Sequence, residues 1–208
     1  MIDWLKKEWN NLALTYCNDN LAEALWNEIK TNYTSKTKHY HNLTHIYNML
    51  LQAGDFKAEI NNLDAFKFAI WYHDIIYKSS KKDNEEKSAL FAKKRLKSFN
   101  FTEKRIEIVE KLIISTKKHQ LILEENNDNA YLLDLDLSIL GTEWKTYEKY
   151  IQNIRKEYKI YPNILYNPGR KKVLLHFLER ETLYFTETFR DKYEIQARDN
   201  LKREIELL

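Results

Sequence analysis

Apolar residues recur along the chain at intervals of three and four positions, the spacing that places them on one face of an α-helix. Leu21, Leu25 and Ile29 show this spacing in a segment that Asp19 can cap. No segment shows the turn-bounded alternation of apolar and polar residues that predicts a strand. The pattern predicts an all-α fold, and the expected helices cover approximately 3–16, 19–29, 42–54, 63–77, 84–97, 102–118, 130–140 and 142–159, with two more towards the C-terminus.

The scarcity of turn-forming residues supports long helices. The 208 residues include only three Gly and two Pro, whereas a sandwich or barrel needs turn residues every dozen positions or so. Both prolines lie in the segment 161–169, which is expected to be a loop. A chain of this length is near the upper end of what one hydrophobic core supports, so we expect a single compact helical domain over 1–208.

Charge and cysteine content limit the functional classes only loosely. The formal net charge of +3 is too small an excess to indicate a nucleic-acid binder. Cys17 is the only cysteine and cannot form an intramolecular disulfide, and no long apolar run indicates a membrane segment. We therefore expect a cytoplasmic protein, and its oligomeric state stays open.

The first candidate for chemistry is the dipeptide His73-Asp74. Phe66, Ile70 and His73 follow one another at steps of four and three, which predicts that His73 points into the interior. A carboxylate beside it, near the end of an apolar helix, costs several kcal/mol unless it has a partner. A cation bound by both side chains would remove that cost. The alternative is a core histidine followed by an aspartate that makes a local hydrogen bond.

His45 is the candidate for a second imidazole ligand. It lies four residues after His41, so both side chains project from the same side of a helix or its first turn. Two inward histidines would be unusual in a surface loop. The alternative is that His41 is solvated and that His45 is a buried hydrogen-bonding residue.

Two carboxylates interrupt the otherwise apolar helix 130–140. Asp134 and Asp136 lie among leucines, where an ionised carboxylate needs either a cation or an ion pair from another helix. Because two positions separate them, they point to different sides, and the residues alone leave open which one joins the histidines. Two imidazoles and two carboxylates form a mixed nitrogen and oxygen set that suits Mn, Mg, Co, Ni, Fe or Zn without selecting among them.

The order His45, His73-Asp74, Asp136 resembles the H…HD…D signature of the HD superfamily of metal-dependent phosphohydrolases, which is an all-α family. Longer blocks are similar to those of one bacterial group of HD hydrolases, and the likeness extends over nearly the whole chain. These blocks are HYHNLTHI at 39–46, WYHDIIY at 71–77, DNEEKSA at 83–89, LDLDLSILG at 133–141 and GRKKVLLHFLER at 169–180.

The resemblance implies a fold, a ligand set and a reaction. It implies an HD-type helical bundle with its metal core over about 39–141 and C-terminal helices packed on that core. Asp136 rather than Asp134 is then the fourth ligand to one divalent ion, with a second ion as an option. The implied reaction is hydrolysis of a phosphate ester, in a nucleotide or another small phosphorylated metabolite, by a metal-activated water in which Asp74 takes part.

Such a reaction needs a proton-transfer group. Glu85 and Glu86 begin the helix that follows the polar loop 78–83 behind His73-Asp74, so either could serve. Each could instead only complement the dipole of its own helix.

Four residues are candidates for substrate binding: His41, Lys117, His119 and Arg170. Lys117 and His119 could bind phosphate, or could form a solvated basic cluster at a helix end. Arg170 could grip phosphate with two hydrogen bonds, or make a surface pair. Two other classes stay open. One is a helical binding module without turnover, and the other is a di-iron oxygenase that would need further ligands from His41 or His119.

Overall fold

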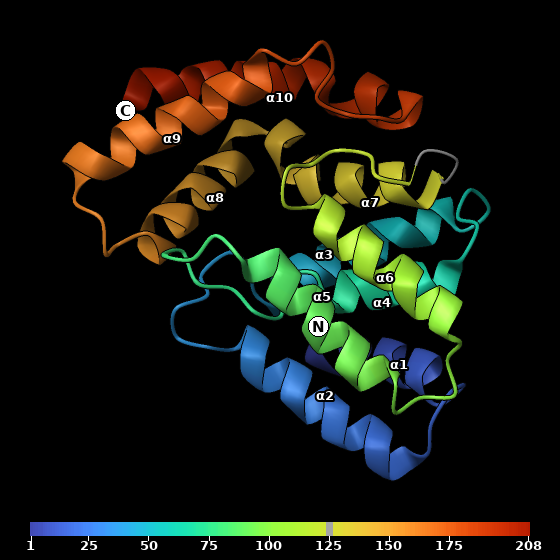
Figure 1. The fold of residues 1–208 in the computed structure, drawn as a ribbon. Coiled ribbons are helices and arrows are strands. Elements are labelled where there is room, and N and C mark those ends of the chain that lie inside the picture. The colour runs from blue at the N-terminus through green and yellow to red at the C-terminus, as the bar shows by residue number, and fades with distance from the viewer. Residues whose placement is uncertain (124–126) are drawn as a thin grey trace. The chain divides into compact units, whose positions relative to one another are not determined.

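The computed structural model describes residues 1–123 and 127–208, which form ten α-helices and two short 3-10 helices without any strand (Figure 1). The prediction of an all-α fold is confirmed. In chain order the elements are α1 Ile2–Ala13, α2 Asp19–Tyr33, α3 Leu43–Ala53, η1 Gly54–Phe56, α4 Leu63–Tyr72, α5 Asn84–Leu96, α6 Glu103–Ser115, α7 Asn127–Leu137, η2 Ser138–Gly141, α8 Trp144–Glu157, α9 Asn163–Leu178 and α10 Glu187–Leu207.

The helices group into two compact units, Met1–Leu132 and Leu133–Leu208. The boundary falls inside α7, so this single continuous helix begins in the first unit and ends in the second. That 1–208 is one domain stays a prediction.

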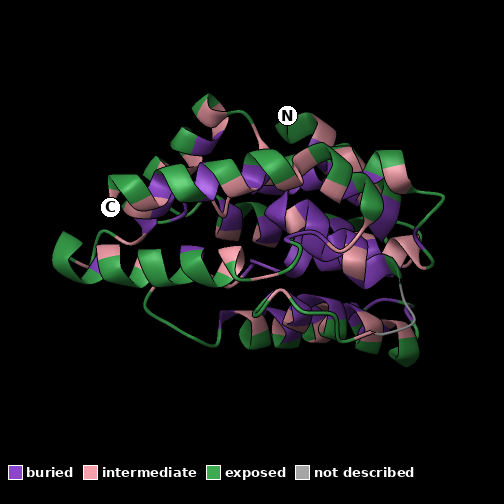
Figure 2. Cartoon of the chain, turned by 90° about the horizontal axis from the view of Figure 1, so that it is seen from above, coloured by how far each residue is buried: buried purple, intermediate pink, exposed green. Residues whose placement is uncertain are grey.

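Helix α4 is the centre of the first unit, where it packs against α3, α5 and α6. Seven of its ten residues are buried: Ala65, Phe66, Phe68, Ala69, Ile70, Trp71 and Tyr72. A helix that is apolar on all sides must be surrounded by other elements, and Figure 2 shows the buried residues concentrated on the inner helices. The residues that follow α4 therefore start from a fixed, water-poor position.

Aromatic side chains from the first two helices join this core. Trp9 of α1 and Trp26 of α2 both meet Trp71 edge to face, with ring centroids 5.7 and 6.2 Å apart. The Trp9 indole also donates a hydrogen bond to the Ala22 carbonyl at 2.9 Å. Such pairs add about 0.5–1.5 kcal/mol each beyond their buried area, so they hold α4 against α1 and α2.

Side-chain caps set several helix starts in the first unit. Asn42 caps α3 and Thr102 caps α6, each by accepting a backbone N–H with its side-chain oxygen. Helix α2 is capped by Asn18, whose Oδ1 accepts from Leu21, so the expectation that Asp19 is the cap was wrong by one residue. Asp19 instead occupies the first turn, where its charge complements the helix dipole.

The second unit is built around α10, which packs against η2, α8 and α9. Gly141 ends η2 where α10 passes very close. A Cβ at this position would collide with the Cβ of Tyr193 and lie 2.7 Å from its carbonyl oxygen, so only glycine fits. The Asn200 amide then donates to the carbonyls of Leu140 and Thr142 at 2.8 and 2.7 Å, which fixes the chain on either side of that glycine.

The loop expected over 161–169 is mostly helical, which corrects the prediction. Pro162 is the N-cap of α9, and Pro168 lies inside this helix. Pro168 has no N–H to donate to the carbonyl of Ile164 one turn earlier, but Ile164 is highly exposed, so water can solvate that carbonyl. The prolines therefore delimit the first turns of a surface helix and do not interrupt it.

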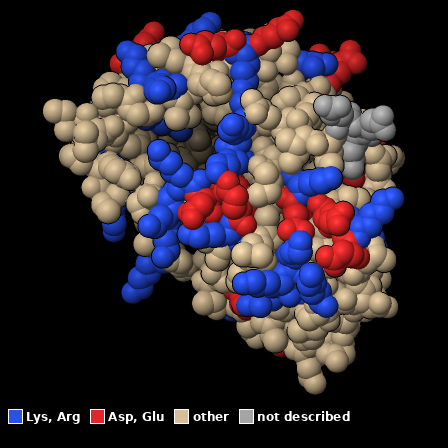
Figure 3. All heavy atoms as spheres, in the orientation of Figure 1, with Lys and Arg blue, Asp and Glu red and all other residues tan. Residues whose placement is uncertain are grey.

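The charged residues are well mixed. Ion pairs of the first unit include Lys93 with Glu110 at 2.9 Å and Arg95 with Glu28 at 2.6 Å. Figure 3 shows acidic and basic side chains lying next to one another over one face. Among the described helices, none has the length and apolarity needed to cross a bilayer.

Candidate metal centre

His73 and Asp74 lie where α4 ends. The helix stops at Tyr72 with His73 as its C-cap, five residues before the expected end at Tyr77. His73 is only 1% exposed, and its Nδ1 lies 2.9 Å from the carbonyl oxygen of Ile70. Because a carbonyl can only accept, Nδ1 carries the hydrogen, and Nε2 of the neutral ring keeps its lone pair for a ligand. The local backbone thus selects the tautomer that a metal needs.

His45 brings a second imidazole nitrogen to the same place from α3. Its Nε2 lies 3.1 Å from Nε2 of His73 and 3.9 Å from Oδ2 of Asp74. Nε2 of His73 and Oδ2 of Asp74 are 3.0 Å apart. All three residues are buried, so the polar atoms meet inside the first unit and not at its surface.

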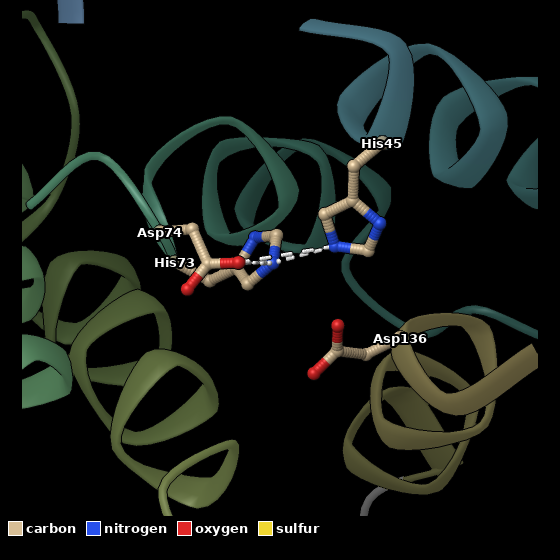
Figure 4. A group of neighbouring side chains, drawn as sticks. All are labelled: His45, His73, Asp74 and Asp136. Atoms are coloured by element: carbon tan, nitrogen blue, oxygen red, sulfur yellow. Dashed lines mark hydrogen bonds and ion pairs between the residues drawn. The ribbon is translucent and has the colours of Figure 1, made fainter. Parts of the chain in front are cut away.

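Asp136 adds a fourth ligand atom from the last turns of α7. It is half-buried, and Figure 4 shows its carboxylate pointing towards the other three side chains. One ligand atom from each of the four residues lies within 4.8 Å of all the others. The structure therefore brings together the four residues proposed as ligands from the sequence.

These separations fit a single cation. For metal bonds of about 2.1 Å to nitrogen or oxygen, ligands at right angles are about 3.0 Å apart and opposite ligands about 4.2 Å apart. The three separations among His45, His73 and Asp74, which are 3.0, 3.1 and 3.9 Å, fall in this range, and the ligand atom of Asp136 lies within 4.8 Å of the other three. Two imidazoles and two carboxylates also suit a divalent ion that keeps open positions for other ligands.

Asp134, the alternative ligand, has a different task. Its Oδ1 accepts the N–H of Phe185 at 2.7 Å, and its Oδ2 accepts the N–H and the hydroxyl of Thr186 at 2.8 and 2.7 Å. Thr186 is the N-cap of α10, so Asp134 holds the start of that helix. Burial raises the pKa of Asp134 to about 6, and these hydrogen bonds oppose the rise. With its oxygens used in this way, Asp134 leaves Asp136 as the candidate ligand of α7.

Three polar residues that the sequence did not single out as part of the site hold the segment after His73. Ser88 accepts the N–H of Ile76 and donates to its carbonyl, and Asn84 does the same for Lys78. Lys38 donates to the carbonyls of Asp74 and Ile75. The block 83–89 therefore contacts this segment through Asn84 and Ser88. The only sequence signal of Asn84 and Ser88 is that polar residues recur in a helix that must pack on α4, and Lys38 has no comparable signal.

The two candidate proton-transfer residues differ in their surroundings. Glu86 is exposed and pairs with Lys117, and this partner lowers the pKa of Glu86. Glu85 is half-buried, and burial raises its pKa above the ordinary value, with the charge of Asp74 raising it further. Of the two, Glu85 is therefore the one that senses the charge of the cluster.

Two histidines proposed for substrate binding are placed differently. The ring of His41 stacks on Tyr77 with centroids 3.8 Å apart, and its centroid is 6.3 Å from that of His45. His41 thus borders the cluster without being one of the four ligands. His119 has φ of 47°, a left-handed conformation that is uncommon outside glycine and places a bend directly after Lys117 and Lys118.

Arg170 belongs to a buried network of the second unit. Its Nε and Nη2 donate to Glu204 at 2.7 and 3.0 Å, and Tyr147 donates to the same carboxylate at 2.5 Å. This pairing uses the fork of the guanidinium for a structural contact between α9 and α10. A role in gripping phosphate stays a prediction.

Comparisons with known proteins do not extend this picture. No protein-family model, curated protein or solved structure matches the chain. What the structure establishes is an all-helical chain with a buried group of two histidines and two aspartates that could hold a metal ion.

Proposed function

We propose that the chain is a metal-dependent phosphohydrolase of the HD type, acting on a phosphate ester in a nucleotide or another small phosphorylated metabolite. The observation that supports this is the convergence of His45, His73, Asp74 and Asp136, in the order and residue types of the H…HD…D signature, on a volume that fits one cation. Sequence order and three-dimensional position agree on the same four residues, although α3, α4 and α7 are far apart along the chain.

The four residues would hold one divalent ion. When bound, such an ion polarises a phosphoryl oxygen and lowers the pKa of water from about 16 towards 7. The chain prepares the ligands in advance, because the Ile70 carbonyl keeps the lone pair of His73 on Nε2. The two carboxylates would also balance the charge of the ion and help to retain it against exchange with solvent.

Glu85 is the proposed proton-transfer residue. General acid and base catalysis is most effective when the pKa of the group lies near the working pH, and burial moves the pKa of Glu85 in that direction. Lys117 and His41 are the proposed contacts for the negative charge of the substrate. Lys117 already holds one carboxylate, that of Glu86.

Metal analysis combined with a phosphate-release screen tests the proposal. Purified protein is stripped with a chelator, reloaded with each divalent ion and assayed on nucleotides, sugar phosphates and phosphodiesters. We expect about one ion per chain and release of phosphate from one of these classes. The variant Asp74→Asn should lose both the bound ion and the release of phosphate. Asp64→Asn is the matched control, since Asp64 is also on α4 but pairs with Arg105 at 3.2 Å and should keep both.

The other outcomes separate the alternative functions. A bound ion without turnover of any substrate class would indicate a binding module in which the metal is structural. Two iron ions per chain with oxygen consumption would indicate a di-iron oxygenase. A chain that binds no divalent ion would refute the proposal.

A further inference from the structure

Lys38 is a buried cation next to the metal centre. It is 8% exposed, although it comes from the polar segment before α3. A buried ammonium costs several kcal/mol unless hydrogen bonds replace its water. Its Nζ donates to the carbonyl oxygens of Asp74 at 2.6 Å and Ile75 at 3.1 Å, and lies 4.3 Å from the centroid of the Tyr33 ring. These contacts are what makes the burial of Lys38 tolerable.

The carbonyls that Lys38 binds belong to the turn by which the chain leaves α4. This turn lies just past the C-cap His73, next to the negative end of the helix dipole, where a cation is favoured. The Tyr33 hydroxyl donates to a further carbonyl of the same end, that of Trp71, at 3.0 Å. Tyr33 and Lys38 therefore fix both sides of His73.

We propose that Lys38 is a positioning residue of the metal centre, whose ammonium orients the Asp74 and Ile75 peptide groups so that the His73 imidazole and the Asp74 carboxylate meet at one ion. The inference rests on the metal site of the proposed function and deepens it. It assigns to Lys38 a contribution to metal affinity in addition to its packing.

The geometric reason is the adjacency of the two ligands. His73 and Asp74 are consecutive residues at and just past the C-cap of α4, so their side chains reach one ion only if the backbone between and after them is held in one orientation. Nε2 of His73 and Oδ2 of Asp74 are 3.0 Å apart, close to the spacing of adjacent ligands on an ion. The Ile70 carbonyl fixes the ring of His73, and Lys38 is the corresponding support on the Asp74 side. Groups that orient ligands in this way typically contribute about 10-fold to 100-fold in metal affinity.

The test compares Lys38→Met with the wild type, using Co²⁺ as the probe. Methionine keeps most of the apolar stem and removes the three donors and the charge. Affinity is measured by competition with a chelator, well below the unfolding temperature of each apo protein, and the visible absorption spectrum of bound Co²⁺ reports ligand geometry. We expect Lys38→Met to bind Co²⁺ about 10-fold to 100-fold more weakly and to change the spectrum. Lys38→Arg, which keeps the charge and donors, should recover most of the affinity.

Lys67→Met is the matched control. Lys67 is a half-buried lysine on α4 itself, paired with Glu8 at 3.3 Å, so its loss tests a general effect of removing an α4 contact. It should leave Co²⁺ affinity and spectrum unchanged. A folded Lys38→Met with wild-type affinity and spectrum would overturn the inference, and so would an equal loss in Lys67→Met.

If Lys38→Met does not fold, Lys38→Gln takes its place, since it keeps a neutral donor on a shorter side chain. A folded Lys38→Gln with reduced affinity supports the inference, and one with wild-type affinity overturns it. Failure of both variants to fold at saturating Co²⁺ would show that Lys38 has only a structural role. A wild-type chain that binds no Co²⁺ would instead refute the metal site itself, and the two failures are thus distinguishable.

Discussion

The two aspartates of α7 should respond in opposite ways to the same substitution. Asp136→Asn removes a proposed metal ligand, whereas Asp134→Asn removes the acceptor that holds the start of α10. Both variants remove one negative charge from the same helix. Each is therefore the control for the other.

Without metal, Asp136→Asn should raise stability slightly. The ligand oxygens of Asp74 and Asp136 lie within 4.8 Å of each other, and like charges at that distance repel by about 3 kcal/mol at an effective dielectric constant of about 20, or about 1 kcal/mol in full water screening. At pH 8, where imidazoles are ordinarily neutral, relief of this repulsion should raise the melting temperature by a few degrees.

Asp134→Asn should be destabilising. Asparagine replaces one carboxylate oxygen by an amide NH₂. That NH₂ would face another donor, which is either the N–H of Phe185 or the N–H and hydroxyl of Thr186. Losing one or two charge-assisted hydrogen bonds in a buried place costs about 2–4 kcal/mol. For a chain of this size, that corresponds to a fall of roughly 5–15 °C in melting temperature.

The assay is thermal unfolding with and without a divalent ion. An ion at about 100 times its dissociation constant stabilises the wild type by about 2.7 kcal/mol. We expect this stabilisation, seen as a rise in melting temperature, to persist in Asp134→Asn, whose melting temperature without the ion is lower. In Asp136→Asn the rise should vanish at the same ion concentration. If Asp136→Asn keeps the shift while a folded Asp134→Asn loses it, Asp134 is the ligand and the assignment is wrong.

Three further predictions concern other charged groups of the chain. Glu85→Gln should lower kcat by about 100-fold to 10,000-fold with metal content unchanged, while Glu86→Gln should retain most activity. Equal effects of the two variants in a steady-state phosphate assay would contradict the assignment of Glu85 as the proton-transfer residue. Burial raises the pKa of the Asp128 carboxyl, so the folded chain binds the proton of this group more tightly than the unfolded chain does. The contribution of Asp128 to stability is therefore present at low pH and is lost as pH rises through the raised pKa. In denaturant titrations with chelator between pH 4 and 7, the stability of wild type relative to Asp128→Asn should therefore increase as pH falls, and a pH-independent difference would refute this. Arg170→Met leaves the buried carboxylate of Glu204 without its cation and should cost about 3–5 kcal/mol in denaturant unfolding, and a loss below 1 kcal/mol would contradict the burial of the pair.

Local sequence determined which segments are helical and where several of them begin. The periodicity of apolar residues specifies a buried face without reference to the rest of the chain, and caps such as Asn42 and Thr102 act within three residues of their own position. Local rules also misplaced some features. Pro168 lies inside α9, because a proline near the start of an exposed helix removes only a hydrogen bond that water can replace.

The four residues that could hold an ion were recognisable from the sequence because carboxylates and imidazoles are conspicuous in apolar surroundings. The choice between Asp134 and Asp136 was not settled by burial, since the more buried residue, Asp134, is the one with backbone partners. Only the fold shows those partners, since Phe185 and Thr186 lie 51 and 52 residues further along the chain.

Tertiary structure alone decided which distant groups the buried cations pair with. Lys38 reaches the carbonyl of Asp74 across 36 residues, and Arg170 reaches Glu204 across 34. Neither partner can be read from the sequence, because lysine and arginine are common and carry no periodic signal. A side chain's own identity and neighbours fix its local conformation, but the free energy of a buried charge depends on which distant groups replace its water, and only packing brings those groups to it.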